Sequence, residues 1–152
     1  MSAPREPGGS LLDVNVLVAM TWPTHVHHDV ARRWFEREAS LGWATCPITQ
    51  LGFVRVSSNP KIIRDAVSPG EALAVLERLI ELPGHRFWPA DIALALAGPF
   101  ASLAMIGHRQ VIDAYLLALT QQQEGKLVTL DRGIADLIAD RAQRARWVEC
   151  IE

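Results

Sequence analysis

The sequence is poor in lysine and has no large excess of positive charge. Lys61 and Lys126 are its lysines, the basic residues number 15 against 17 acidic ones, and the formal net charge is -2. A strongly basic nucleic-acid-binding domain would show an excess of Lys and Arg, so that class is not indicated. Any contact with nucleic acid must depend on a few well-placed arginines, whose planar guanidinium suits a phosphate group.

Cysteine is scarce as well, and long apolar runs are absent. Cys46 and Cys150 lie far apart without a C-x-x-C spacing, which favours buried free thiols in a reducing cytosol over a redox pair or a zinc site. No apolar run is long enough to span a membrane, and the opening MSAPREPGGS lacks the apolar region of a signal peptide. We therefore expect a cytoplasmic protein with no membrane segment.

Length and composition predict one globular domain. The chain has 152 residues, 49% of them hydrophobic and 21% charged, and its mean hydropathy is +0.12. Such a chain can bury a core without disulfides or a structural metal. Residues 1–10 are rich in Pro, Gly and Ser and are expected to form a flexible leader, and residues 11–152 are expected to form the domain.

Segments with strand and helix patterns alternate along the chain. We expect strands at 11–15, 42–47, 85–90, 126–130 and 145–151. We expect helices at 28–39, 48–60, 68–82, 109–125 and 132–142, with shorter helical pieces in the apolar segment before residue 108. This alternation predicts a three-layer α/β/α fold around a mostly parallel central sheet of about five strands.

Three aspartates stand beside apolar elements. Asp13 interrupts the run LLDVNVLVA, and Asp131 follows the expected strand KLVTL, so both are expected at the carboxyl ends of strands, where open parallel sheets form their crevice. Asp113 lies near the start of a long helix, whose dipole favours an ionised acid. Each also has a plain structural interpretation: Asp13 or Asn15 could cap a short helix, Asp131 could cap the next one, and Asp113 could suit a first turn.

Taken together, these acids indicate a cation site. An unpaired charge within a packed core costs several kcal/mol, and like charges gathered at one crevice repel each other unless a cation binds. Oxygen ligands without Cys or paired His select hard cations, namely Mg²⁺ or Mn²⁺.

Four stretches, LLDVNVLVA, CPITQLGFVRVSSNP, HRQVIDAYLLALT and LVTLDRGI, occur in this order. From about residue 11 to 148 the sequence resembles the PIN-domain ribonucleases, and specifically the VapC toxins of bacterial type II toxin–antitoxin systems. The resemblance implies a PIN-like fold and a Mg²⁺- or Mn²⁺-dependent endoribonuclease that leaves 5′-phosphate and 3′-hydroxyl ends. It also implies inhibition by a cognate VapB-type antitoxin and a homodimer. Asp13 and Asp113 match the metal ligands of the family, and Asp131 matches its further catalytic acid.

One position departs from the family pattern. Where the general pattern has Glu after the second strand, we place Gln50, whose amide brings an oxygen but no charge. We therefore expect one firmly held ion on Asp13 and Asp113, with Gln50 orienting substrate or water. Supporting roles are also assigned to Asn15, which two residues after Asp13 could bond a carboxylate, and to Thr129.

Arginine, histidine and tryptophan offer further candidates. Arg55, five residues after Gln50, could bind a substrate phosphate or simply lie on a solvated helix face. The histidines of HVHH at 25–28 lack further zinc ligands nearby, so the start of a helix and packing are favoured there. Trp22, Trp43, Trp88 and Trp147 are expected in the core rather than stacked on RNA bases.

Two rival functions remain open at this point. A phosphoryl-transfer enzyme of the haloacid-dehalogenase type would need a second Asp where Asn15 stands. A catalytically weakened PIN-like module could bind antitoxin or RNA without cleaving it, and the three retained aspartates disfavour that alternative.

Overall fold

Five parallel strands form the centre of the molecule in the computed structural model, which describes residues 8–95, 100 and 103–152. The strands are β1 (Ser10–Leu12), β2 (Trp43–Thr45), β3 (His85–Phe87), β4 (Lys126–Thr129) and β5 (Val148–Cys150), and their order in the sheet is β3-β2-β1-β4-β5. Every pairing is parallel. The predicted α/β/α fold with a parallel sheet of about five strands is confirmed.

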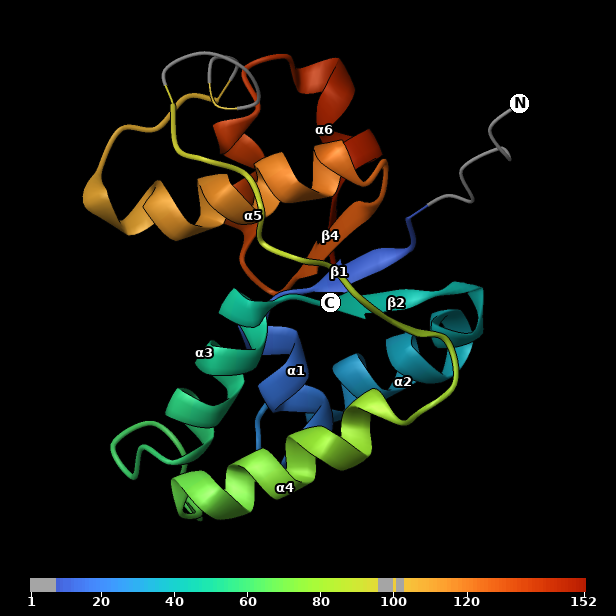
Figure 1. The fold of residues 1–152 in the computed structure, drawn as a ribbon, viewed down its shortest axis with the longest axis vertical. Helices are drawn as coiled ribbons and strands as arrows, with labels where there is room; N and C mark the ends of the chain where they lie inside the picture. The colour runs from blue at the N-terminus through green and yellow to red at the C-terminus, as the bar shows by residue number, and fades with distance from the viewer. Residues whose placement is uncertain (1–7, 96–99, 101–102) are drawn as a thin grey trace.

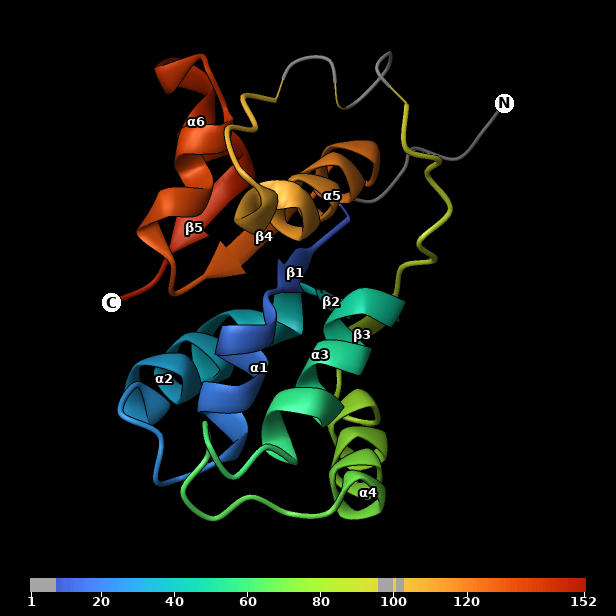
Figure 2. The same cartoon turned by 90° about the vertical axis from the view of Figure 1, so that its left-hand side faces the viewer.

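Helices cover both faces of this sheet (Figure 1). The α-helices are α1 (Val14–Thr21), α2 (His28–Glu38), α3 (Pro47–Ser57), α4 (Pro69–Ile80), α5 (Val111–Gln122) and α6 (Arg141–Trp147), and short 3₁₀ helices span Ala39–Leu41, His108–Gln110 and Arg132–Leu137. Figure 2 shows α1 to α4 on one side of the strands and α5 and α6 on the other.

Two hydrophobic clusters hold these layers together. Leu12, Trp43 and Phe53 belong to the cluster on the α1 to α4 side, and Leu11 and Leu127 belong to the cluster under α5. Leu11 and Leu12 are neighbours in β1 and are both fully buried, because successive strand residues point to opposite faces of a sheet. Each face of the central strand therefore anchors one helical layer.

The strand order places a crevice beside β1. The chain runs outward from β1 through β2 to β3 and then returns to β4 on the other side of β1. In open parallel sheets, the carboxyl ends of the two strands at such a reversal frame a crevice. Asp13 and Asp131 follow those two strands.

The strand expected at 11–15 is shorter than predicted, and the prediction was wrong at Asn15. β1 ends at Leu12, and α1 begins at Val14 with Asp13 as its N-cap. The Asp13 carboxylate accepts a hydrogen bond from the Val14 amide at 2.8 Å, which starts a helix in a segment whose valines favour a strand. The capping alternative for Asp13 is thus confirmed.

The last third of the chain also departs in detail. The helix expected at 132–142 is a 3₁₀ helix over Arg132–Leu137 followed by the separate helix α6, which Asp140 caps by accepting a bond from the Ala142 amide. β5 therefore starts at Val148 rather than at 145. Residues 91–95 contain no helix, and residues 96–99 and 101–102 lie outside the described part of the chain.

The expected leader, residues 1–10, can be compared with the structure only in part. Residues 1–7 lie outside the described part of the chain, and Ser10 is the first residue of β1.

Several smaller predictions can be compared with the structure. Trp43 and Trp88 are buried, and Trp22 and Trp147 are partly buried against the two clusters, as expected of core residues. His27 occupies the N-cap position of α2 without a side-chain capping bond and α2 begins at His28, which confirms the interpretation of HVHH as the start of a helix. Within the described residues, no helix combines the length and apolar character needed to cross a membrane.

Gly84, just before β3, has a backbone conformation that predicts a specific mutational effect. Its φ is +87°, and a Cβ atom there would lie 2.3 Å from the carbonyl oxygen of Ala39. We expect Gly84→Ala to lower the free energy of unfolding by about 1–3 kcal/mol in urea denaturation followed by tryptophan fluorescence. The matched control is Gly70→Ala in the first turn of α4, where a Cβ meets nothing within 4 Å. Equal stability of the two variants would contradict this account.

Candidate active site

Asp13 is a buried carboxylate held by two hydrogen bonds. Its side chain is 7% exposed at the carboxyl end of β1. One oxygen accepts from the Val14 amide and the other accepts from the Thr129 hydroxyl, each at 2.8 Å. Because β1 and β4 are neighbours, Thr129 at the end of β4 is within reach, and both oxygens keep a fixed direction.

Thr129 is the centre of a small hydrogen-bond network. Its hydroxyl oxygen also accepts bonds from the Asn15 side-chain amide at 3.3 Å and from the Asp131 backbone amide at 3.0 Å. The Asn15 carbonyl oxygen accepts from the Leu130 amide at 3.2 Å. Asn15 therefore reaches the acids through Thr129, and the direct bond to a carboxylate that we predicted for it is replaced by this contact.

Asp113 and Asp131 complete the group of acids. Asp113 lies in the first turn of α5 and is half-buried, and Asp131 is exposed and caps the following 3₁₀ helix by accepting a bond from the Gly133 amide at 2.8 Å. All three aspartates line one cavity of about 340 Å³, which we call the acid cavity. The structure thus brings together the three acids that the sequence singled out.

Burial and mutual repulsion make it unfavourable for all three aspartates of the acid cavity to be ionised at the same time. Burial raises the pKa of Asp113 to about 6, and the nearby charges of Asp13 and Asp131 add to this effect. Burial also raises the pKa of Asp13, while its bonds from Thr129 and Val14 act in the opposite direction and the charge of Asp131 raises it further. A cation between these groups would relieve both the repulsion and the cost of burial.

The donor set fits a hard divalent cation held partly by water. The acids supply oxygen ligands, which suit Mg²⁺ or Mn²⁺. Within the described ranges, no three His, Cys, Asp or Glu side chains converge into a complete ligand set. Mg²⁺ keeps several waters in most protein sites, so two carboxylates with waters are a sufficient protein contribution.

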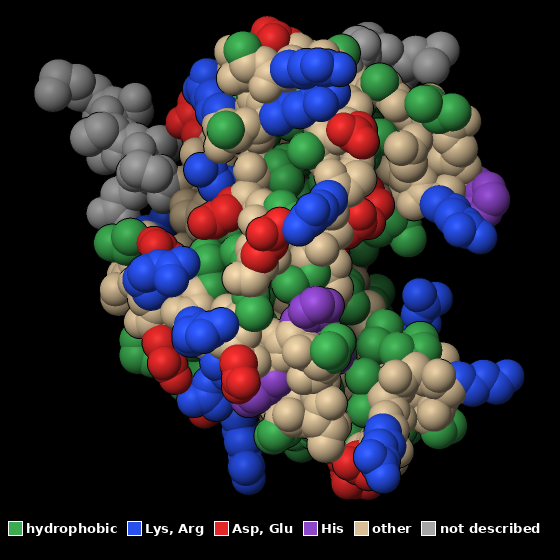
Figure 3. Space-filling model, turned by 180° about the vertical axis from the view of Figure 1, so that it is seen from behind, with side chains coloured by type: hydrophobic (Ala, Val, Ile, Leu, Met, Phe, Trp, Pro, Cys, Tyr) green, Lys and Arg blue, Asp and Glu red, His purple; other side chains and the backbone are tan. Residues whose placement is uncertain are grey.

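A second cavity of about 470 Å³ adjoins the first and shares Asp13 and Asp113 with it. Arg55 on α3 and Arg109 in the 3₁₀ helix before α5 also line it, and both arginines are exposed. Seen from behind, a notch at the edge of the molecule has Lys and Arg side chains on either side of it (Figure 3). We call this second cavity the arginine cavity.

Gln50 is not brought to the acids. Its side-chain amide donates to the hydroxyl of Thr45 at 3.0 Å, and Gln50 lines neither cavity. Gly52, two residues further along α3, lines the arginine cavity instead. A Cβ at Gly52 would lie 2.4 Å from Val14 Cγ2, so the helix approaches α1 closely there. The role predicted for Gln50 at the acids finds no support in this placement.

Two residues at the cavities were not assigned to the site from the sequence. Arg109 stands four residues before Asp113, a spacing that places both on the same side of a helical segment and could have indicated it. His25 lines the acid cavity, and we had weighed it only as a zinc ligand or a packing residue. Cavity lining by a loop residue leaves no periodic signal in a sequence.

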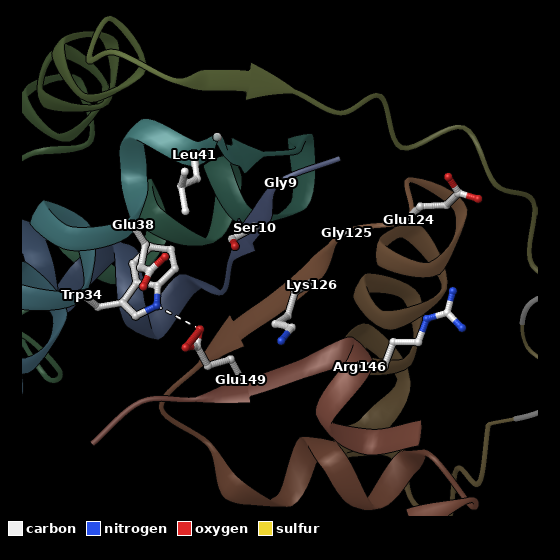
Figure 4. A pocket seen from close by; sticks show the side chains of 11 residues that line it. Gly9, Ser10, Trp34, Glu38, Leu41, Glu124, Gly125, Lys126, Arg146 and Glu149 are labelled. Atoms are coloured by element: carbon white, nitrogen blue, oxygen red, sulfur yellow. Dashed lines mark hydrogen bonds between the residues drawn. The ribbon is translucent and has the colours of Figure 1, made fainter. Parts of the chain in front are cut away.

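A further cavity of about 370 Å³ lies at the opposite edge of the sheet (Figure 4). Ser10 and Lys126, which begin β1 and β4, line it, whereas Asp13 and Asp131 follow the other ends of those strands. Trp34 donates its indole N–H to Glu149 there at 3.0 Å. None of the residues predicted for the site lines this cavity.

Comparison with known proteins identifies a family. The family described as PIN domain matches residues 10–139. Ribonuclease VapC39 of Mycobacterium tuberculosis is 46% identical over 127 residues, covering 84% of this chain and 91% of that protein. Ribonuclease VapC38 of the same organism is 46% identical over 132 residues, covering 87% of this chain and 92% of that protein.

A solved structure supports the fold. The crystal structure of VapBC2 from Rickettsia felis bound to a DNA fragment from their promoter matches with a TM-score of 0.62. The match covers 95% of this chain and 99% of the other chain at 14% sequence identity. At this level of identity the likeness concerns the fold alone.

Removing one charge from the acid cavity should stabilise the metal-free protein. The pKa of Asp113 is raised from 3.8 to about 6, so its stabilising protonated form is lost as the pH rises through that window. Asp113→Asn should therefore gain about 1 kcal/mol near neutral pH, a figure reduced for the partial exposure of the side chain, or roughly 2–4 °C in melting temperature.

Thermal melts in EDTA at about pH 7.5 and about pH 5 measure this difference, which should shrink at the lower pH. Glu77→Gln on the exposed face of α4 removes an equal charge outside the cavity and serves as the control. A gain of the same size in both variants would show that net charge, not the acid cavity, is responsible.

Thr129→Val should disturb the site while keeping the shape of the side chain. The change removes the donor to Asp13 and the acceptor for Asn15, so we expect a loss of about 1–3 kcal/mol in unfolding free energy. Mn²⁺ affinity measured by calorimetry should fall about 10- to 100-fold. Thr129→Ser keeps the hydroxyl and should retain most of the affinity, so equal losses in the two variants would count against the network.

Proposed function

The chain belongs to the PIN-domain family, and we propose that it is a metal-dependent endoribonuclease toxin of the VapC type that hydrolyses RNA phosphodiester bonds. The observation that carries this proposal is the convergence of Asp13, Asp113 and Asp131 on one cavity at the carboxyl ends of β1 and β4. Relatives with 46% identity over most of the chain are named ribonucleases, which supports the same conclusion.

Asp13 and Asp113 are the proposed ligands of one Mg²⁺ or Mn²⁺ ion, with waters as the remaining ligands. A bound divalent ion supplies an acidified water and offsets the negative charge that builds on the phosphoryl oxygens. Asp131, the exposed member of the group, orients the attacking water toward the phosphorus. Asn15 and Thr129 keep Asp13 and the Asp131 backbone in position. The products are 5′-phosphate and 3′-hydroxyl ends.

The arginine cavity is the proposed path of the RNA strand toward the acids. Arg55 and Arg109 come from two different elements, and among the described residues neither guanidinium group has a hydrogen bond or an ion pair. A guanidinium without a partner beside a nuclease site can bind a phosphate through two parallel bonds. Arg55, which could also have been a solvated residue, is therefore assigned to substrate binding together with Arg109.

A cognate VapB-type antitoxin is the proposed inhibitor. The structural neighbour is VapBC2 from Rickettsia felis, which supports a VapB-type partner for this chain. Leu51 and Ile112 line the arginine cavity and are 71% and 58% exposed, so apolar surface is available next to the site. We also propose a homodimer and a cytoplasmic location, where RNA is accessible and free thiols such as those of Cys46 and Cys150 persist.

The alternative functions lose support from the geometry. The module without cleavage was suggested by Gln50, which lines neither cavity, whereas the three acids remain together. A haloacid-dehalogenase mechanism needs an acid at position 15, where the Asn15 side chain is bonded to Thr129 and Leu130.

A cleavage assay tests the proposed function. The protein is incubated with a panel of structured RNAs in Mn²⁺ or Mg²⁺ and, in parallel, in EDTA. We expect cleavage only with metal, and a loss of about 100-fold or more in Asp113→Asn, since a metal-ligating carboxylate supports several kcal/mol of transition-state stabilisation. Glu77→Gln should cleave like the unaltered protein. Undiminished cleavage in EDTA would refute the mechanism, and absence of cleavage with metal would favour the binding module.

A further inference from the structure

His25 contributes an imidazole to the acid cavity that the proposed mechanism does not use. It lies in the loop between α1 and α2, far in sequence from the three acids, and it lines the cavity together with them. Its side chain is partly buried. His25 therefore places an imidazole ring, which can form hydrogen bonds, beside the proposed reaction centre.

A hydrogen bond from the backbone determines which nitrogen of the His25 ring carries the proton. The backbone amide of His27 donates to His25 Nδ1 at 3.0 Å, so Nδ1 is an acceptor and carries no proton. Burial lowers the pKa of His25, and the neighbouring His27 and His28 lower it further, so the ring is neutral near pH 7. The proton of the neutral ring is then on Nε2, which within the described residues has no hydrogen-bond partner.

Apart from Asn15, whose side chain is bonded to Thr129 and Leu130, the remaining walls of the acid cavity are apolar. They are formed by Val14, Val18, Val56, Ile62 and Ile63. A cavity of about 340 Å³ falls within the usual range of about 300–1,000 Å³ for small-molecule sites. The cavity therefore offers carboxylates for a metal, a largely apolar wall and, on His25, an N–H group without a partner among the described residues.

These features of the acid cavity indicate which part of a nucleotide would bind in it. A neutral imidazole beside aliphatic side chains is a weak site for a phosphate, for which Arg55 and Arg109 are available in the adjoining cavity. A nucleobase is flat, has apolar faces and carries acceptor atoms at its edge, and single-stranded RNA is recognised through such unstacked bases. The aliphatic wall suits the face of a base, and the Nε2–H group of His25 suits an acceptor at the edge of that base.

We propose that the acid cavity holds the base of a nucleotide next to the bond that is cut, and that the Nε2–H group of His25 donates a hydrogen bond to an acceptor on that base. This inference rests on the proposed ribonuclease function and adds a determinant of sequence preference to it. His25 is a residue that contacts the substrate, and the acids carry the reaction.

Two other roles for His25 are disfavoured. As a metal ligand it would have to join the acids, yet within the described part of the chain no three such side chains form a ligand group. The contact that ties this region to α1 is made by His28, the first residue of α2, whose Nδ1 is 2.8 Å from the carbonyl oxygen of Ala19, so His25 is not needed for it.

The first test does not depend on cleavage. Long-range ¹H–¹⁵N spectra of the histidine rings, recorded with Mg²⁺ near neutral pH, report the tautomer of His25 directly. We expect a neutral ring protonated at Nε2. Titration with each of the four nucleoside 5′-monophosphates should shift the His25 signals for at least one base, and ribose 5-phosphate at equal concentration should shift them far less. A ring protonated at Nδ1, or equal shifts with and without a base, would overturn the proposal.

The second test uses RNA cleavage. A pool of short RNAs with randomised central positions is cut by the unaltered protein, by His25→Ala and by the control Val26→Ala, whose side chain is 86% exposed in the same loop. His25→Ala should lower kcat/KM about tenfold, the value of one lost hydrogen bond and its packing, and should remove the preference for one base beside the cut. Mn²⁺ affinity should stay unchanged in this variant, and Val26→Ala should keep the preference.

The outcomes separate this inference from the function on which it rests. Equal loss on all sequences together with weakened Mn²⁺ binding would make His25 a metal ligand and overturn the proposal. Full activity with unchanged preference in His25→Ala would overturn it as well. If the unaltered protein cuts no RNA, the ribonuclease function fails, and the ring spectra still decide whether a base binds beside His25.

Discussion

The site depends on the stabilisation of one buried carboxylate. Asp13 is 7% exposed between two hydrophobic clusters, where an unpaired charge would cost several kcal/mol. The Val14 amide and the Thr129 hydroxyl stabilise it, and both donors are available because a helix begins directly after β1 and β4 lies beside it. These same bonds fix the direction of the carboxylate, so the compensation for burial also positions the group for a metal ion.

The remaining parts of the site follow from the order of the strands. Because β1 and β4 are adjacent, the turn after β4 carries Asp131 to the same edge, and α5 brings Asp113 there from the other layer. Two cavities meet at Asp13 and Asp113, one with a neutral imidazole and aliphatic walls and one with two arginines. This division of polar groups fits the proposed RNA substrate, whose phosphates and bases would enter different cavities.

The sequence predicted the sheet and the acids more accurately than the residues around them. Alternating apolar segments and acids at the ends of strands or at the start of a helix are local patterns, and they singled out Asp13, Asp113 and Asp131, which the structure brings to one cavity. Asn15 was misplaced because a run of valines indicates a strand, whereas the Asp13 cap starts a helix. The direction of the Gln50 side chain, which bonds to Thr45, depends on the rotation of α3, and the place of His25 in the acid cavity depends on how a loop packs, so the sequence could predict neither.

Calorimetric titration of Mn²⁺ into the RNA-free protein tests the central claim most directly, since the account requires Asp13 and Asp113 to form a cation site before any substrate binds. It predicts saturable binding of a single ion that releases protons near pH 6, where Asp113 is partly protonated, and that disappears in Asp13→Asn. Absence of saturable binding, or binding that is unchanged in Asp13→Asn, would contradict the account.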